Sequence, residues 1–143
     1  MCLTMPRFLD VEASSLNTDS YPIEIAWSNE FGNIECHLIN PYAVDTWTDW
    51  DFYAQHKIHG ISRLLCREQG VHPEHMCHLM NQSIKPGETI FADGGQFDEN
   101  WVNVLYCAGS EMGYAPFKII HSDSIMLPLL MKVEHDNKKC WQL

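Results

Sequence analysis

Two carboxylates lie two positions apart in the segment FLDVEASSL, residues 8–16. Asp10 and Glu12 alternate with the apolar residues Leu9 and Val11, so an extended chain sends both acids to one face. Like charges at that spacing repel unless a cation neutralises them or one carboxylate takes up a proton. The segment therefore predicts either a strand end open to water or a site for a positively charged ligand.

A third acid, Asp98, lies in ADGGQFDENW, where a predicted strand gives way to a predicted helix. One interpretation is that Asp98 only stabilises the start of that helix, which is worth at most about 1 kcal/mol. The other starts from the convergence of strand ends on one rim of a sheet, where Asp98 would meet Asp10 and Glu12. Because hard divalent cations prefer carboxylate oxygens, this second interpretation predicts a metal site.

The elements that must position these acids follow from hydrophobic periodicity and turn residues. The first part of the chain is predicted to form strands at residues 5–12, 23–28 and 34–39. The later part is predicted to form helices at 59–70, 73–84, 97–109 and 124–135 and strands at 87–94 and 117–123. An antiparallel meander followed by alternating helices and strands predicts an α/β fold, a mixed sheet flanked by helices.

Length and composition limit the class of protein. The 143 residues suit one domain, and 45% hydrophobic with 20% charged residues is typical of a globular chain. We find no apolar run long enough to span a membrane and no secretory signal pattern. The six cysteines form no CxxC pair, so we expect reduced thiols in a cytoplasmic protein. The net charge of −10 argues against duplex binding through a broad basic surface, but an acidic metal pocket is compatible with an enzyme acting on nucleic acid.

Three segments together resemble the DEDDh 3′–5′ exonucleases, the family of ribonuclease T and the polymerase proofreading subunits. FLDVEASSL followed by YPIEIAW is similar to the family's first motif, and FADGGQFDENWVNVL to its second. HGIS, residues 59–62, is similar to the His-Gly-Ile that lies between them. The resemblance implies a ribonuclease H-like fold, with three antiparallel strands followed by parallel strands. It also implies a single exonuclease-like domain over residues 1–143, which lacks part of the family's last helix.

The resemblance further implies hydrolysis that releases nucleotides from the 3′ end of single-stranded RNA or DNA with two Mg²⁺ or Mn²⁺ ions. Asp10 would bridge both metals, while Glu12 and Asp98 would complete the ligand set. Glu24 matches an acid common in the family. A homodimer is also expected from the family. The terminal nucleotide would lie against five residues, for which loop and core packing is the alternative interpretation: Ala13, Ser14, Leu16, His59 and Ile61.

The family's third motif is a His, the general base for the attacking water, followed five positions later by a metal-binding Asp. His135 is the best candidate for this base, but Cys140 stands at the fifth position after it and Asp136 is out of register. His121 and Asp123 form an alternative pair, for which a turn and helix cap is the favoured interpretation.

A binding function is the alternative from a different class. In it, a nuclease-fold protein no longer cleaves and serves as a nucleic-acid or protein-binding module. The candidates to stack on bases are Trp27, Trp47, Trp50, Tyr53 and Trp101, although packing in the core and its covering loops is the favoured interpretation for most of them. The path of residues 130–143 separates the two functions. His135 at the rim of the three acids favours catalysis, whereas a tail that points elsewhere favours the binding module.

Two other chemistries are less favoured by the sequence. His75 and His78 share one face of a predicted helix near Cys77 and suit zinc, but no second Cys/His pair has the spacing of a structural zinc site. Surface histidines are the simpler interpretation. Cys–His nucleophilic catalysis has no preferred cysteine among the six.

Overall fold

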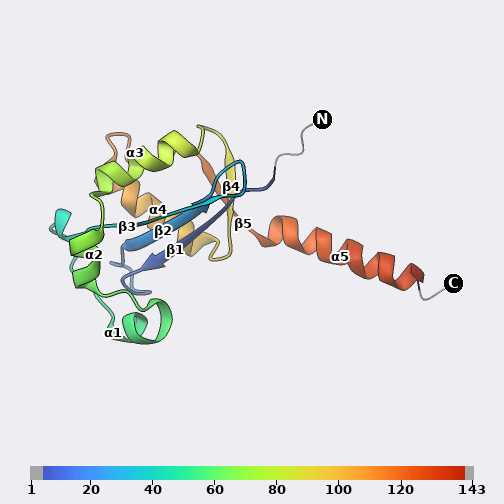
Figure 1. Cartoon of the computed structure of the whole chain (residues 1–143), viewed down its shortest axis with the longest axis horizontal. Coiled ribbons are helices and arrows are strands. Elements are labelled where there is room, and N and C mark those ends of the chain that lie inside the picture. The colour runs from blue at the N-terminus through green and yellow to red at the C-terminus, as the bar shows by residue number, and fades with distance from the viewer. Residues whose placement is uncertain (1–4, 141–143) are drawn as a thin grey trace.

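One mixed sheet forms the centre of the molecule. The computed structural model describes residues 5–140, with side chains for residues 5–132. The strands are β1 (Phe8–Ala13), β2 (Pro22–Ser28), β3 (Ile34–Leu38), β4 (Thr89–Ala92) and β5 (Lys118–His121). Their order in the sheet is β3-β2-β1-β4-β5 (Figure 1). The pairs β1–β2 and β2–β3 are antiparallel, whereas β1–β4 and β4–β5 are parallel. The predicted antiparallel meander followed by parallel strands is therefore confirmed.

The helices flank this sheet and follow the predicted order. They are η1 (Pro41–Ala43), α1 (Phe52–Ala54), η2 (Gln55–His59), α2 (Arg63–Gln69), α3 (Pro73–Ser83), α4 (Gln96–Gly109) and α5 (Asp123–Cys140). The helix predicted at 59–70 begins later, at α2, because Ser62 caps it by accepting a hydrogen bond from the backbone N–H of Leu65. The prediction missed α1 and the π-helical turn η2, since their aromatic-rich segment shows no helical apolar period.

The hydrophobic core lies between one face of the sheet and α4. Leu9 and Val11 of β1 are 3% and 5% exposed, and their partners on β2 are Trp27 and Ile25. Helix α4 contacts β1, β2 and β5 and also packs against α3. The period of two along β1 therefore sends its apolar residues into the core and its acids to the opposite face.

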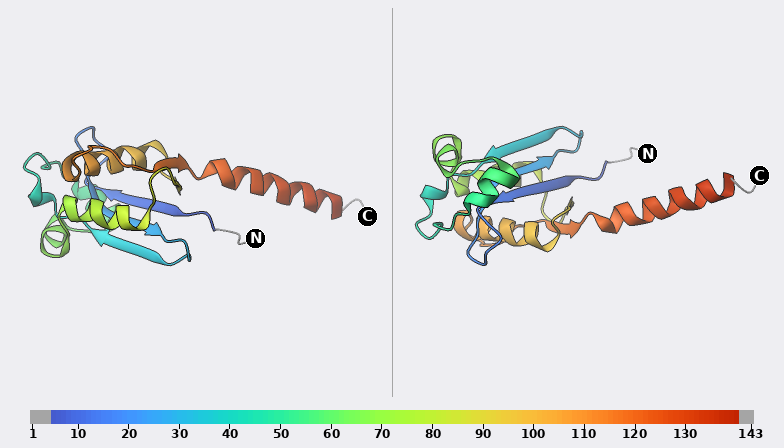
Figure 2. Two further views of the ribbon diagram at one scale, coloured as in Figure 1. Left: turned by 90° about the horizontal axis from the view of Figure 1, so that it is seen from above. Right: turned by 90° about the horizontal axis from the view of Figure 1, so that it is seen from below.

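The opposite face of the sheet stays largely open in the described part of the chain. Phe8 on β1 is 41% exposed and Ile34 on β3 is 75% exposed. Helix α5 leaves the sheet at the end of β5 and points away from the body in every view (Figures 1 and 2). None of the described helices, α5 included, is both long and apolar enough to cross a membrane.

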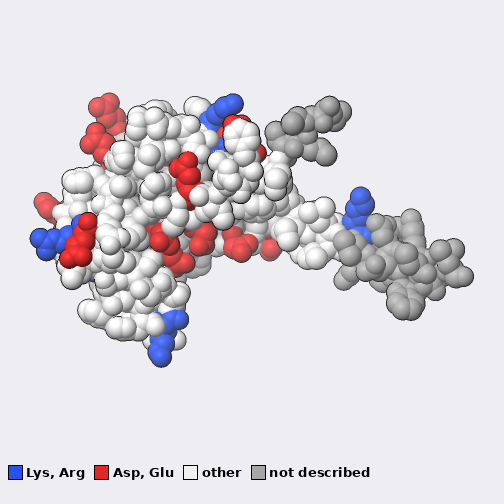
Figure 3. Space-filling view, in the orientation of Figure 1, with Lys and Arg blue, Asp and Glu red and all other residues white. Residues whose placement is uncertain are grey.

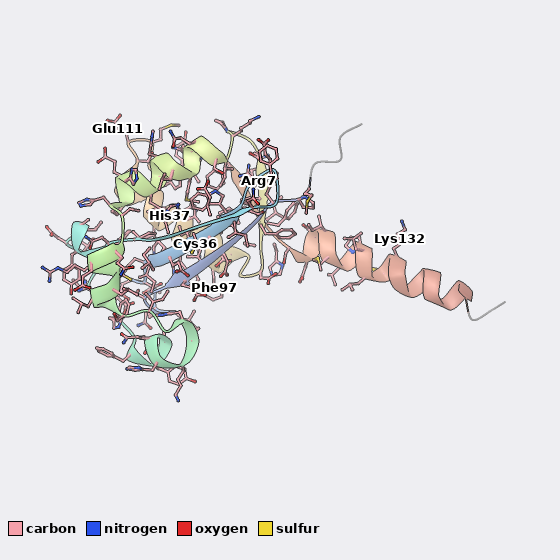
Figure 4. All side chains as sticks on the ribbon, in the orientation of Figure 1. Arg7, Cys36, His37, Phe97, Glu111 and Lys132 are labelled. Carbon is pink, nitrogen blue, oxygen red and sulfur yellow. The ribbon has the colours of Figure 1, made fainter. Side chains whose placement is uncertain are left out.

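A buried arginine fixes the start of β1. The Arg7 guanidinium donates to the Ser28 carbonyl at 2.9 Å and to the Ser83 carbonyl at 2.9 Å. It also forms an ion pair with Glu88 at 2.7 Å. These bonds connect β1 to the end of β2, to the end of α3 and to the segment before β4 (Figure 4). Arg7 therefore sets the position of the strand that carries Asp10.

Candidate functional site

Strands β1 and β2 bring acidic side chains together on the open face of the sheet. Glu12 lies directly opposite Glu24 across the antiparallel pair, and Asp10 lies opposite Ala26. Like charges at opposed positions destabilise a sheet, so strand pairing alone does not account for this arrangement. The register shifts between Glu12 and Ala13, which marks a β-bulge of the kind found beside active sites.

Asp98 reaches the same place from the first turn of α4. It is 3% exposed, and its Oδ2 accepts a hydrogen bond from the Gly94 N–H at 3.2 Å. The Gly94–Gly95 turn has to approach this carboxylate closely, because a Cβ on Gly94 would lie 2.6 Å from the Asp98 Oδ1. Gly95 has a φ of +54°, a conformation that L side chains rarely adopt. The two glycines thus allow a buried carboxylate at the start of the helix.

The acids are close enough to change one another's protonation. Burial, and after it the charge of Asp10, raises the pKa of Asp98 to about 6. Burial also raises the pKa of Glu12, with further increases from Asp10, Glu24 and Asp98. We call Asp10, Glu12, Glu24 and Asp98 the acid cluster. Perturbed carboxyl groups of this kind are typical of sites that bind a cation or exchange a proton.

The acid cluster offers the carboxylate oxygens that a divalent cation prefers, although its side chains are not arranged around a common point. The ion pairs of the described residues use Glu88, Glu35 and Asp123, so the cluster's carboxylates are not neutralised by a basic side chain. A hard cation would stabilise the charged carboxylates of Glu12 and Asp98, whose pKa values are raised by burial and by the neighbouring acids. Within the same residues, no group of three or more His, Cys, Asp and Glu side chains is arranged to hold a metal ion. Binding would therefore require the carboxylates to turn toward a common point.

The loop after β1 is held by Asp49, a residue that sequence reasoning missed. Its carboxylate accepts hydrogen bonds from Ser14 Oγ at 2.8 Å, Ser15 Oγ at 2.5 Å and Asn17 Nδ2 at 3.2 Å. Burial raises the pKa of Asp49, but the bonds from Ser15, Asn17 and Ser14 outweigh burial and leave the pKa below its usual range. The Ser14 hydroxyl is thus engaged inside the loop, whereas Leu16 is 72% exposed beside it. No local signal identifies Asp49, because it lies 35 positions from Ser14.

The HGIS segment lies beside the end of β1. His59 Nδ1 accepts a hydrogen bond from the Ile61 N–H at 3.0 Å. Burial lowers the pKa of His59, and the nearby Ala13 backbone offsets part of this effect. His59 Nε2 is buried without a hydrogen bond of standard geometry to any described residue. Ile61 belongs to the hydrophobic core. His59 lies near the backbone of Ala13, the last residue of β1 before the loop.

His121, the last residue of β5, lies close to Asp98 of the acid cluster. The charge of His121 lowers the pKa of Asp98, and a Cβ on Gly95 would collide with the His121 ring. The turn favoured for His121 and Asp123 is present, because the Asp123 N–H donates to His121 Nδ1 at 3.1 Å. Asp93, directly after β4, also raises the pKa of Asp98. Asp93 directly follows β4, whereas His121 is the last residue of β5. The carboxyl end of a strand is the signal that could have identified Asp93 from the sequence, which singled out His121 only in its pair with Asp123.

His135 belongs to the part of α5 whose side chains lie outside the described residues. Its helix runs away from the sheet (Figures 1 and 2). The single chain therefore does not bring the segment with His135 and Asp136 to the acid cluster. The backbone of this segment points away from the acid cluster, which is the path that favours a binding function.

The zinc alternative gains no support from the described residues. His75 and His78 are exposed on α3, with ring centroids 6.4 Å apart. Cys77 between them is 2% exposed and faces the core. Cys36, Cys66, Cys77 and Cys107 are free, as expected. Surface histidines, the favoured interpretation, agree with this geometry.

Comparison with known proteins identifies the fold. No protein-family model matches the chain, and no curated protein matches it. Exonuclease I from E. coli in complex with a 5cy-dT13 oligonucleotide is 14% identical with a TM-score of 0.63, and the match covers 84% of this chain and 28% of that one. A product-bound exonuclease I is 15% identical with a TM-score of 0.62, covering 84% and 30%. Exonuclease I from Methylocaldum szegediense is 13% identical with a TM-score of 0.58, covering 80% and 27%.

These matches show the fold alone, because the identities are low. The chain has the ribonuclease H-like α/β fold of the exonuclease I structures, so the predicted fold class is confirmed. It spans less than a third of the length of the chains that it matches. The activity and ligands of those larger proteins are therefore matters for proposal.

Proposed function

We propose that this chain is a metal-dependent nuclease of the DEDDh type that releases nucleotides from the 3′ end of single-stranded RNA or DNA. The acid cluster carries the proposal. Asp10 and Glu12 share the open face of β1, and buried Asp98 approaches them closely enough for its pKa to rise to about 6. The likeness of the fold to exonuclease I structures supports this proposal.

In this proposal the carboxylates of Asp10, Glu12 and Asp98 would hold two Mg²⁺ or Mn²⁺ ions. When bound, such ions activate the attacking water and stabilise charge on the leaving 3′ oxygen. The chain's own residues orient this site. The pairing of β1 with β2 places Asp10 and Glu12 on the open face, and the Gly94 N–H holds the Asp98 carboxylate at the helix start.

The terminal nucleotide would lie where the loop after β1 meets the HGIS segment. Structures of E. coli exonuclease I include complexes with ssDNA, which supports a single-stranded substrate here. Leu16 is exposed and can contact a base, and His59 Nε2 is a polar atom without a partner in the described residues. Ala13, Ser14 and Ile61 are buried, and the Ser14 hydroxyl is bound to Asp49, so we propose that these three residues shape the pocket rather than expose side chains to the ligand.

A binding module of the same fold is the second candidate. The outward path of the α5 backbone favours it, since this helix runs away from the sheet that carries the acid cluster. The two functions share a single-stranded ligand and differ in whether that ligand is cleaved.

The decisive experiment uses single-stranded DNA and RNA labelled at the 3′ nucleotide, incubated with the full chain and Mn²⁺. We expect release of labelled mononucleotide that stops with EDTA and falls at least about 100-fold in Asp10→Ala. Glu111→Gln, an exposed acid away from the cluster (Figure 4), is the matched control and should cleave normally.

No metal-dependent release above the Asp10→Ala background would overturn the nuclease proposal. Fluorescence anisotropy with the same oligonucleotides then separates the remaining outcomes. Binding without cleavage supports the binding module, whereas neither binding nor cleavage overturns both functions.

Two further expectations belong to this proposal. The free thiols of Cys36, Cys66, Cys77 and Cys107 agree with a reducing compartment, and we propose the cytoplasm. We also propose that the chain works as a homodimer, for which the open sheet face offers a surface.

A further inference from the structure

We infer that α5 of one copy docks on the open sheet face of a second copy, so that two chains exchange these helices in a symmetric dimer. The open face and the protruding helix are both left unpartnered by the fold of the described residues. The inference rests on this pairing of surfaces and is independent of the nuclease proposal.

The receiving surface is a groove of about 590 Å³ on the open face. Its apolar part is lined by Phe8 of β1, Ile34 of β3 and Phe91 of β4, with Met126 at the start of α5. We call these four residues the apolar groove. Phe8 and Phe91 lie with ring centroids 6.2 Å apart, and Ile34 is 75% exposed. Contiguous apolar surface of this kind on a sheet marks an interaction site.

The docking element is the first half of α5. Five large apolar side chains on it are between 43% and 70% exposed: Met126, Leu127, Leu129, Leu130 and Met131. At 100° per residue these side chains spread over more than half of the helix circumference. A helix that is apolar around so much of its surface is stable only when it is buried. No other described element covers these side chains (Figures 1 and 2).

The direction of α5 favours docking on the groove of a second copy rather than on the groove of its own chain. Met126 lies at the edge of the chain's own groove, and the helix continues outward from there without interruption to Cys140. Leu130 and Met131 therefore lie beyond the groove of their own chain, although they match its apolar character. Since each copy offers the same groove and the same helix, the exchange is reciprocal and closes as a two-fold dimer.

Charge argues against a nucleic acid in the apolar groove. No Lys or Arg lines it, and Asp10 and Asp93 stand at its border. Acidic side chains form a row on the body that reaches the base of α5 (Figure 3). The groove itself thus offers no basic side chain to a phosphate, whereas an apolar helix with the exposed Lys132 (Figure 4) is compatible with the acidic border.

The first test measures the molar mass of the full chain by size-exclusion chromatography with light scattering. We expect twice the 16.5 kDa of one chain. Leu130→Glu on α5 should shift the protein to the monomer, and Ile34→Glu on the groove should do the same. Leu64→Glu is the matched control, because Leu64 on α2 is 55% exposed, as Leu130 is, and lies away from both surfaces. This control should remain dimeric, and circular dichroism should show an unchanged fold.

A second measurement, by cross-linking, tests the exchange of α5 even if one of the Glu variants folds poorly. A photoreactive benzoylphenylalanine replaces Leu130 in a mixture of ¹⁴N- and ¹⁵N-labelled chains. We expect cross-links from it to peptides of strands β1 and β3, with half of these links joining an unlabelled and a labelled chain.

Three results would overturn the inference. One is a wild-type monomer at all concentrations, as expected if α5 bends back at Pro128 onto its own groove. Another is a set of cross-links confined to chains of one label. The last is a dimer that persists in both Leu130→Glu and Ile34→Glu. None of these readouts uses nuclease activity, so the proposed nuclease activity is untouched by any of them. The inference rests on the homodimer proposed above, so a wild-type monomer overturns both, whereas failure of the variant or cross-linking tests overturns only the exchange of α5.

Discussion

Asp98 shows how one residue connects helix structure to site chemistry. Acids are favoured in the first turn of a helix, and its carboxylate does accept the Gly94 N–H. Burial and the charge of Asp10 nevertheless raise its pKa to about 6 from 3.8. Between these two pH values the folded chain keeps a proton on Asp98 that the unfolded chain has lost. The favourable helix position thus only partly offsets a buried charge beside other charges.

Replacing Asp98 with Asn should therefore stabilise the protein when no metal is bound. The folded pKa is raised, so stability is greatest below about pH 4 and is lost as the pH rises through about 6. At pH 7 we expect a gain of about 2 kcal/mol, since the shift is worth about 3 kcal/mol and the lost helix-start charge costs about 0.3–1 kcal/mol. Urea unfolding in EDTA at pH 4 and pH 7 measures this difference, which should vanish at pH 4.

Glu99→Gln is the control for that experiment, because Glu99 is an exposed acid in the same helical turn. It should give no gain. Adding Mn²⁺ at about 100 times its Kd should raise the wild-type stability by about 2.7 kcal/mol and leave Asp98→Asn nearly unchanged. If Mn²⁺ stabilises both proteins equally, Asp98 does not hold the metal.

At the scale of elements, the position of β1 decides where the acids lie. Its bulge and its pairing with β2 place Asp10 and Glu12 on the open face, while β4 delivers the Gly94–Gly95 turn alongside. Arg7 fixes this arrangement, since its guanidinium bonds to β2, to α3 and to Glu88.

Arg7→Ala should lower the free energy of unfolding by about 3–5 kcal/mol, because it leaves Glu88 and two carbonyls without their partner. Arg67→Ala, an exposed arginine on α2, should change it by less than about 0.5 kcal/mol. Chemical denaturation of the two variants provides the comparison. Equal effects would mean that the buried arginine does not hold the strands together.

At the scale of the whole molecule, the net charge of −10 determines how a nucleic acid approaches. A protein with this charge repels phosphates, so counterion release from a basic surface cannot supply the affinity. Divalent cations in the acid cluster would reverse the local charge. The charge of the molecule and the metal requirement of the site are therefore linked.

We accordingly expect weak binding of a single-stranded phosphorothioate oligonucleotide, which resists hydrolysis, in the presence of EDTA. Mn²⁺ should tighten binding at least about tenfold by neutralising the acid cluster. Fluorescence anisotropy measures both affinities, with Asp10→Ala as the variant that should lose the metal effect. Tight binding in EDTA would contradict this account.

The sequence by itself determined the sheet and the candidate acids. The period of two around Asp10 and Glu12, the turn residues between strands and the Gly-Gly turn before Asp98 are local signals, and local signals are legible in one chain. The tertiary structure decided the partners that lie far apart along the chain. Asp49 holds the loop after β1, Arg7 clamps β1, and His121 borders Asp98.

The direction of α5 could likewise not be predicted from the sequence. Apolar periodicity predicted a helix at 124–135 but not its direction, because direction depends on which surface covers its apolar side chains. In the folded chain α5 leaves the sheet face uncovered beside Asp10. The sequence thus specified the residues of a candidate site, and only the tertiary structure showed that α5 packs against no other element among the described residues.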